Sequence, residues 1–251
     1  MKILCYVFSW KGQYENATRL ENQISSLGIP VTVINSDDDN QPENWINIGN
    51  DCYFSDQFTK CLEDFNSKEY DVLWHIQADA KSEDFYKIVE SAKSSFDQYN
   101  WGIYAPNVDD TFYTSSRTDV FSLNETQKVV ATTDNTCWFI HKDIISELNK
   151  NIDLMKDNKL GWGWDLLLCG FSHIQQRYVI RDYEYTVDHP ASTGYMKEEA
   201  EKEMIDMFYK CPDELKQIIY YIKQNPSEIG KYYNILNQEI VFSYDTEGTI
   251  R

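Results

Sequence analysis

The chain has 251 residues, enough for one large domain or one domain with a small appendage, and enough to bury a substantial core. Its 41 acidic and 23 basic residues give a formal net charge of −18, which disfavours a broad nonspecific grip on DNA or an anionic membrane. No stretch approaches the roughly 20 apolar residues of a membrane helix, and no signal-peptide cleavage region is visible. The six cysteines form no CxxC pair of a zinc or redox motif, and most fall in apolar runs, which suits a reducing cytosol. We therefore expect a cytoplasmic protein.

The first part of the chain alternates apolar runs with segments of helical spacing. We predict a strand at 2–8, a helix at 13–27 that Gly28 closes, and a strand at 30–34. This order predicts a parallel βαβ unit. The alternation continues with a helix at 51–65, a strand at 71–76, a helix at 84–96 and a strand at 101–105.

The second part of the chain begins with a polar stretch, residues 107–124, which predicts an irregular loop over a site. We then expect strands at 128–132 and 136–140, a helix at 142–149 and an extended segment at 177–187. From residue 197 the pattern changes to charged amphipathic helices broken at Pro212 and Pro226. We therefore place a boundary near residue 196, between a main domain at 1–196 and a helical segment at 197–251 that packs on it.

The run Gly161-Trp162-Gly163-Trp164-Asp165 is the most informative feature of the sequence. Glycines let the backbone approach a ligand closely, and tryptophan offers a flat face and an N–H donor that suit a sugar ring. The apolar residues that follow predict a buried helix, so Asp165 lies in its first turn, where the helix dipole favours a carboxylate. Dipole stabilisation alone is the simpler interpretation of Asp165.

Two further motifs lie at predicted strand ends. Gln77-Ala78-Asp79 follows the strand at 71–76, and open α/β sheets place ligand chemistry at such ends. His189 follows the extended segment at 177–187 and would add a nitrogen ligand to an oxygen ligand in a metal site. The alternatives are a helix cap for Asp79 and an ordinary core, surface or pH-sensitive residue for His189.

Taken in order, these motifs resemble the glycosyltransferases of the GT-A fold over roughly four-fifths of the chain. The resemblance implies an α/β fold, a Rossmann-type, mostly parallel sheet flanked by helices. It also implies transfer of a sugar from a nucleotide-sugar donor, with a UDP-sugar favoured, to an acceptor hydroxyl, assisted by Mn²⁺ or Mg²⁺. One departure is Gln77, which replaces the first acid of the family's Asp-x-Asp motif.

The resemblance also assigns roles to individual residues. It implies that Asp165 is the catalytic base of an inverting enzyme, or a binding residue of a retaining one, and that Asp79 and His189 are metal ligands. The acceptor would lie against Trp162, Gly163 and Trp164. The nucleotide would contact the ends of the first strands and the acidic motif, namely Phe8, Ser9, Trp10, Asp37, Gln77 and Asp79. Asp37 begins a run of three aspartates, which also fits an ordinary solvated turn.

The acceptor is left open between a glycan and a hydroxymethylated DNA base of the kind that phages carry. The net charge of −18 argues against DNA, although Arg117, Lys128 or Arg177 could form a local basic groove. A different class of function is a catalytically inactive nucleotide- or sugar-binding protein, for which Gln77 is the main support.

Overall fold

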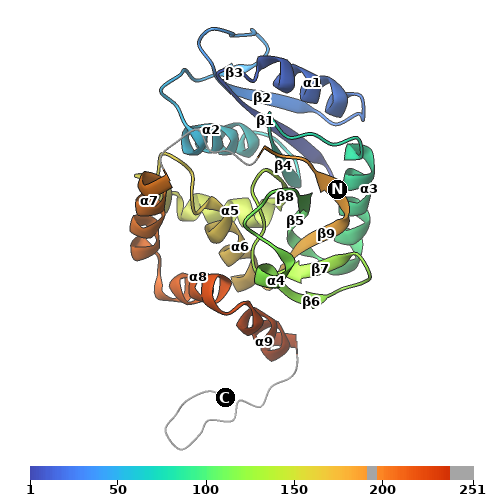
Figure 1. Cartoon of the computed structure of the whole chain (residues 1–251), viewed down its shortest axis with the longest axis vertical. Helices are drawn as coiled ribbons and strands as arrows, with labels where there is room; N and C mark the ends of the chain where they lie inside the picture. The colour runs from blue at the N-terminus through green and yellow to red at the C-terminus, as the bar shows by residue number, and fades with distance from the viewer. Residues whose placement is uncertain (191–196, 238–251) are drawn as a thin grey trace, which may run out of the picture.

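The computed structural model describes residues 1–190 and 197–237 of the chain (Figure 1). Its first part has the elements β1 (Ile3–Trp10), α1 (Tyr14–Ser25), β2 (Val31–Ser36), β3 (Ile46–Asn47), α2 (Phe54–Asn66), β4 (Val72–Gln77) and α3 (Phe85–Tyr99). They alternate as the sequence predicted, except that the short strand β3 was not predicted. Apolar residues at helical spacing form the buried stripes of α1 and α2. Gly28 has a φ of +75°, a conformation that glycine adopts without steric cost, two residues beyond the cap of α1.

The second part of the chain adds more strands than the sequence predicted. Its elements are β5 (Trp101–Val108), α4 (Ser115–Thr118), β6 (Asp119–Ser122), β7 (Gln127–Val130), β8 (Cys137–His141), α5 (Lys142–Lys150), the 3-10 helix η1 (Ile152–Met155), α6 (Trp164–Ile174) and β9 (Tyr178–Val187). The expectation of an irregular loop at 107–124 is wrong over much of its length. β6 forms there because it pairs with β7, so strand pairing overrides its polar composition.

The strands described form one nine-stranded sheet in the order β3-β2-β1-β4-β8-β5-β9-β7-β6. The predicted α/β class is confirmed, but the sheet is only partly parallel. β3, β2, β1 and β4 run parallel to one another, as do β5 and β9. β8 lies antiparallel between β4 and β5, and β7 and β6 are antiparallel additions at the far edge.

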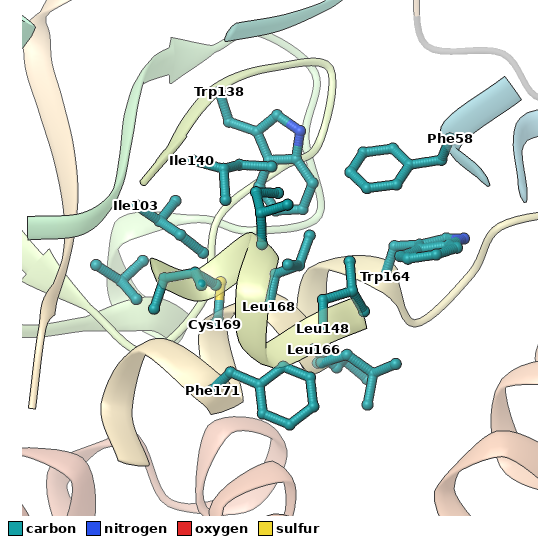
Figure 2. Close-up of a cluster of buried hydrophobic side chains, with 14 of the residues drawn as sticks. Phe58, Ile103, Trp138, Ile140, Leu148, Trp164, Leu166, Leu168, Cys169 and Phe171 are labelled. Atoms are coloured by element: carbon teal, nitrogen blue, oxygen red, sulfur yellow. The ribbon is translucent and has the colours of Figure 1, made fainter. Parts of the chain in front are cut away.

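Two apolar cores lie on opposite faces of the sheet. α1 and α3 cover one face, where Leu20, Ile88 and Trp74 are buried. α2, α5 and α6 cover the other face, where Phe58, Trp138 and other large side chains meet (Figures 1 and 2). α6 is buried on every side from Trp164 to His173, so it needs cover on its outer face as well.

That outer cover comes from the C-terminal helices α7 (Lys197–Lys210), α8 (Asp213–Gln224) and α9 (Pro226–Asn237) (Figure 1). The breaks fall at Pro212 and Pro226, as predicted. Leu215, Ile218 and Ile219 of α8 are buried in the same core as α6. The predicted boundary near residue 196 lies outside the described residues, and the division into two domains stays a prediction.

All six cysteines are unpaired, and five of them are buried, as expected of small apolar residues in a core. In residues 1–190 and 197–237 no helix combines the length and apolarity that crossing a membrane requires.

Truncating one core side chain of α8 tests whether the C-terminal helices and the main body unfold together. Ile219 is 1% exposed, so Ile219→Ala should lower the free energy of unfolding by about 2–5 kcal/mol through loss of buried contacts. The neighbouring Tyr220 is 57% exposed, and Tyr220→Ala should change the free energy of unfolding by no more than about 0.5 kcal/mol. Urea unfolding of Ile219→Ala should stay a single transition. A separate early transition would show that the helices unfold independently.

Candidate active site

A cavity of about 640 Å³ opens beside the start of α6. Its walls come from the end of β4, the segment around α4, the loop between β7 and β8, the loop that precedes α6, and helices α7 and α8. Its lining includes the side chains of Gln77, Tyr113, Arg117, Asp134, Trp162, Asp165, Lys197, Met204 and Lys223, together with Gly161 and Gly163. The motif that dominates the sequence therefore does border a cavity.

The two glycines of this motif take backbone conformations that other residues adopt rarely. Gly161 has a φ of +92° and Gly163 a φ of +105°. A Cβ at Gly161 would lie 2.5 Å from Phe54, and one at Gly163 would lie 2.6 Å from Met207. The close approach of Phe54 and the positive φ together require glycine at 161, while at 163 the positive φ is the stronger constraint because the Met207 methyl group can move.

Polar side chains from distant parts of the chain hold the same loop. The amide of Asn158, which is 3% exposed, accepts from the backbone N–H of Gly161 at 2.8 Å and donates to the carbonyl of Trp162 at 2.6 Å. Glu203 of α7 accepts from the backbone N–H groups of Lys159 and Leu160 at 3.0 and 2.8 Å. These bonds satisfy backbone groups that a tight loop leaves without partners and fix Trp162 at the cavity wall.

Asp165 lies in the first turn of α6, as predicted, and is 5% exposed. Its carboxylate accepts a short hydrogen bond from the hydroxyl of Tyr113. Burial raises the pKa of Asp165 above its ordinary value, while the Tyr113 hydroxyl, the backbone N–H of Leu166 and the ammonium of Lys223 oppose that rise. The result is a carboxylate at a cavity wall whose proton affinity exceeds that of an exposed aspartate.

Trp164 does not line the cavity, contrary to the expected acceptor wall. Its side chain is 0% exposed and packs against Phe58 with ring centroids 4.6 Å apart (Figure 2). Its indole N–H donates to the hydroxyl of Ser55 at 2.8 Å. The reason is helical phase, because Trp164 and Leu168 are four residues apart and share the core face of α6. Trp162, which precedes the helix, is half-buried and faces the cavity.

Arg181 of β9 supports the opposite wall. Its guanidinium is 2% exposed and donates to the carbonyl of Tyr113 and, at 3.3 Å, to the carbonyl of Thr132. Tyr113 belongs to the segment before α4, and Thr132 begins the loop between β7 and β8. One buried cation therefore ties together two wall segments, one of which carries the hydroxyl that contacts Asp165.

Asp79 and His189 come together, as the order of motifs suggested. The Nε2 atom of His189 lies 3.4 Å from the Oδ1 atom of Asp79, and both side chains are mostly buried. Burial lowers the pKa of His189, but the carboxylates of Asp79 and Asp134 outweigh burial and hold it above its usual range. The sheet causes this meeting, because residues 81 and 188 form a bridge just beyond β4 and β9.

The pair has the donor chemistry for a divalent cation. The Oδ1 atom of Asp79 is buried and faces the imidazole of His189 at 3.4 Å, so a carboxylate oxygen and an imidazole nitrogen, a set that suits Mn²⁺, lie next to each other. No group of three or more His, Cys, Asp or Glu residues placed to hold a metal occurs in the described part of the chain. Asp79 and His189 thus fit as a partial ligand set that a diphosphate would complete.

Asp134 was not singled out in the sequence, yet it lies between the two predicted centres. Its Oδ1 atom accepts from the backbone N–H and the hydroxyl of Thr136 at 2.8 and 2.7 Å, and its Oδ2 atom accepts from Thr111 at 2.7 Å. Its charge raises the pKa values of both His189 and Asp165. It therefore couples the two centres electrostatically while its own orientation is fixed.

The structure places the residues predicted to contact a nucleotide in different surroundings, with Gln77 at the wall of the cavity. Phe8 is 0% exposed and packs against Phe54 and Phe58, so its side chain does not reach a ligand, and that expectation is corrected. Ser9 and Trp10 end β1, next to the end of β2. Ser9 has a buried hydroxyl with no partner in the described residues, and Trp10 is half-buried.

Asp37 lies beyond β2 with its carboxylate turned into its own loop. It accepts from the backbone N–H of Asp39 at 3.0 Å and from the amide of Asn40 at 2.9 Å. The Asn40 bond is the largest of the contributions that lower the pKa of Asp37. These are the bonds of a turn, but Asp37 is only 2% exposed, so the alternative of a solvated turn is wrong in that respect.

The three basic residues named for a local DNA groove do not gather at the cavity. Lys128 pairs with Asp119 at 2.6 Å, and Arg177 pairs with Asp143. Arg117 does line the cavity, where Lys197 and Lys223 also lie. The basic lining of this cavity thus comes from the α4 segment and the C-terminal helices.

No protein-family model matches the chain, and no curated protein matches it. Several solved structures, however, are similar to it. GalNAc-T7, crystallised with UDP, GalNAc and Mn²⁺, has a TM-score of 0.57 at 10% identity, over 96% of this chain and 57% of that one. S. aureus TarS has a TM-score of 0.54 at 9% identity, over 98% of this chain and 57% of that one. This chain therefore spans 57% of the length of each, and the fold is that of GT-A-type glycosyltransferases.

Replacing Asp165 by its neutral isostere should stabilise the protein at neutral pH. The pKa of Asp165 is raised in the folded state, so its contribution to stability is fully present below the ordinary aspartate pKa and is lost as pH rises through the raised value. Asp165→Asn should therefore have a higher Tm than the wild type at pH 7, and the difference should shrink as the pH is lowered. A lower Tm at pH 7 would contradict a desolvated carboxylate.

Proposed function

We propose that this protein transfers a sugar from a UDP-sugar to a hydroxyl of a glycan acceptor, with inversion of configuration and with the assistance of a divalent metal. The observation that carries the proposal is Asp165, a buried carboxylate of raised pKa that lines a cavity beside Trp162 in a GT-A fold. A fold alone does not define an activity. The cavity supplies the base and an aromatic wall that such a transfer needs.

Asp165 is the proposed general base. In the transfer, the acceptor hydroxyl attacks the anomeric carbon of the donor sugar, its proton passes to the Asp165 carboxylate, and the bond between that carbon and the diphosphate oxygen breaks. The electron pair leaves with the nucleoside diphosphate on the opposite face of the sugar, so the configuration inverts. The raised pKa favours uptake of the proton, and Tyr113 holds the carboxylate in place.

The donor is proposed to lie between the end of β1 and the pair Asp79–His189. These two residues would hold Mn²⁺ or Mg²⁺, and the cation, when bound, neutralises charge that develops on the departing diphosphate. Ser9, Trp10 and Gln77 lie at the ends of β1 and β4 and would contact the nucleotide. The UDP and Mn²⁺ in the GalNAc-T7 structure support UDP as the nucleotide.

The acceptor is proposed to be a glycan rather than a DNA base. Trp162 presents an aromatic side chain at the cavity, which suits the apolar face of a sugar. Lys128 and Arg177, two of the three cations considered for DNA, are each paired with a carboxylate. With a net charge of −18, the chain offers little general attraction for a polyanion such as duplex DNA.

Turnover of UDP-sugars tests the proposal directly. With Mn²⁺ and without acceptor, the wild type should slowly hydrolyse at least one of UDP-glucose, UDP-galactose, UDP-GlcNAc and UDP-GalNAc. Asp165→Asn should lower that rate by about 10²- to 10⁴-fold, because the substitution removes the general base. Its affinity for UDP should stay the same. Asp97→Asn, on the exposed side of α3, is the matched control and should keep the full rate.

The same assay separates the second candidate, an inactive nucleotide- or sugar-binding protein, which Gln77 favours because it brings no charge to the metal site. UDP binding without turnover in the wild type would support that candidate. If the wild type shows no binding of UDP and no turnover, both candidate functions are contradicted.

Tyr113 should set the pH at which the enzyme becomes active. Its hydrogen bond lowers the pKa of Asp165, so Tyr113→Phe should raise that pKa further and move the acidic limb of the kcat/KM profile to higher pH by about one unit. Tyr220→Phe, on an exposed residue of α8, should leave the profile unchanged. An unshifted limb in Tyr113→Phe would rule out Asp165 as the titrating base.

A further inference from the structure

We propose a second binding site, for a neutral oligosaccharide, in an open groove between α3, the 124–127 turn and β9. The groove has a volume of about 760 Å³, and none of its lining residues lines the cavity of Asp165. Its walls are Ser91, Ser94 and Gln98 of α3 on one side and the turn before β7 on the other. In Figure 1, α3 lies beside β9 and β7 along this edge of the sheet.

The groove and the proposed active site lie on opposite faces of the sheet. Arg181 and Asp182 are neighbours on β9, so their side chains point to opposite faces. Arg181 reaches the carbonyls of Tyr113 and Thr132 at the wall of the Asp165 cavity. Asp182 instead contacts Ser91 of α3, beneath the groove. The proposed second site is therefore separate from the proposed active site, and it stands whether or not the protein transfers sugars.

Asp182 fixes the floor of the groove. It is 0% exposed, and its Oδ2 atom accepts from the hydroxyls of Ser91 and Tyr104, each at 2.7 Å, and from the amide of Gln127 at 3.0 Å. The amide of Gln127 also donates to Ser91 at 3.0 Å. A buried carboxylate with several donors is costly to assemble unless the network is fully satisfied. The network holds Ser91 and Gln127, which line the groove, in single orientations.

The rim adds the groups that bind sugars. Tyr86 is 61% exposed, and Tyr185 lies on the β9 side, so phenol rings border the groove on both sides. Between them Ser94, Gln98 and Thr126 contribute hydroxyl and amide groups. Aromatic faces suit the C–H faces of sugar rings, and hydroxyls and amides both donate to and accept from sugar hydroxyls. The lining thus matches an uncharged, hydroxyl-rich ligand.

The charges at the rim narrow the ligand class. Glu90, Glu125 and Glu184 border the groove, Lys87 is its one lining cation, and Glu90 is paired with Lys93 at 2.8 Å, so Glu125 and Glu184 supply most of the negative charge. Lys87 pairs with Asp84 at 2.7 Å, so little positive charge remains for an anion. A phosphorylated or carboxylated glycan would be repelled here. A neutral chain is therefore the proposed occupant.

Binding of defined neutral hexasaccharides tests the site. Maltohexaose, cellohexaose, mannohexaose and xylohexaose would each be titrated against the full chain by saturation-transfer NMR and calorimetry. At least one should bind in the millimolar range or tighter. Tyr86→Ala should weaken it about tenfold, through loss of ring contact. Tyr209→Ala, which removes a tyrosine that is 70% exposed and outside the groove, should leave the affinity unchanged.

A variant of the other site distinguishes the two locations. Trp162→Ala alters the cavity of Asp165, where the acceptor is proposed to lie, and the hexasaccharide binding that Tyr86→Ala weakens should persist in it. The proposal is overturned if no hexasaccharide binds, if Tyr86→Ala binds as tightly as the wild type, or if Trp162→Ala is the variant that loses binding. Because UDP-sugar turnover is not the readout, failure here would leave the proposed transferase activity intact, and failure of turnover would leave this site intact.

Discussion

The burial of α6 on every side is the constraint on which the rest of the structure depends. A helix that is apolar all round must be covered all round, and here the sheet, α2 and α5 cover one side while α8 covers the other. The same cover builds the cavity, because α7 and α8 supply Met204 and Lys223 to its wall. Asp165 is buried for the same reason, and burial is the main cause of its raised pKa. The cover that α6 requires therefore explains both the packing of the C-terminal helices and the raised pKa of Asp165.

β9 connects the parts of the molecule to which a function is proposed. At its end, the bridge between residues 81 and 188 brings His189 to Asp79. Within it, Arg181 supports the wall that holds Tyr113, and Asp182 organises the opposite face. A single strand thus positions the proposed metal pair, the hydroxyl that contacts Asp165 and the floor of the second groove. Alternation of side chains along a strand is sufficient to separate these roles.

The sequence predicted features that depend on neighbouring residues. The helix that begins with Asp165 in its first turn, the breaks at prolines and the strand ends that carry Asp79 and His189 are all local patterns. Tyr113 and Asp134 were missed because they meet Asp165 only through the tertiary fold, and Tyr113 lies 52 residues away in sequence. Residue type predicted a ligand contact for Trp164, and position at a strand end predicted one for Phe8, whereas helix phase and strand alternation turned both side chains into the core. The sequence of β8 also does not indicate that this strand inserts antiparallel beside β4.

The central claim is that Asp79 and His189 hold a divalent cation against a nucleoside diphosphate, and binding of UDP with and without Mn²⁺ tests it most directly. A ligand that binds the folded state raises Tm by mass action. UDP should raise the Tm of the wild type in Mn²⁺ but not in EDTA, and Asp79→Ala should abolish the rise while the exposed control Asp97→Ala keeps it. No rise with UDP, or an equal rise in Asp79→Ala, would contradict the account.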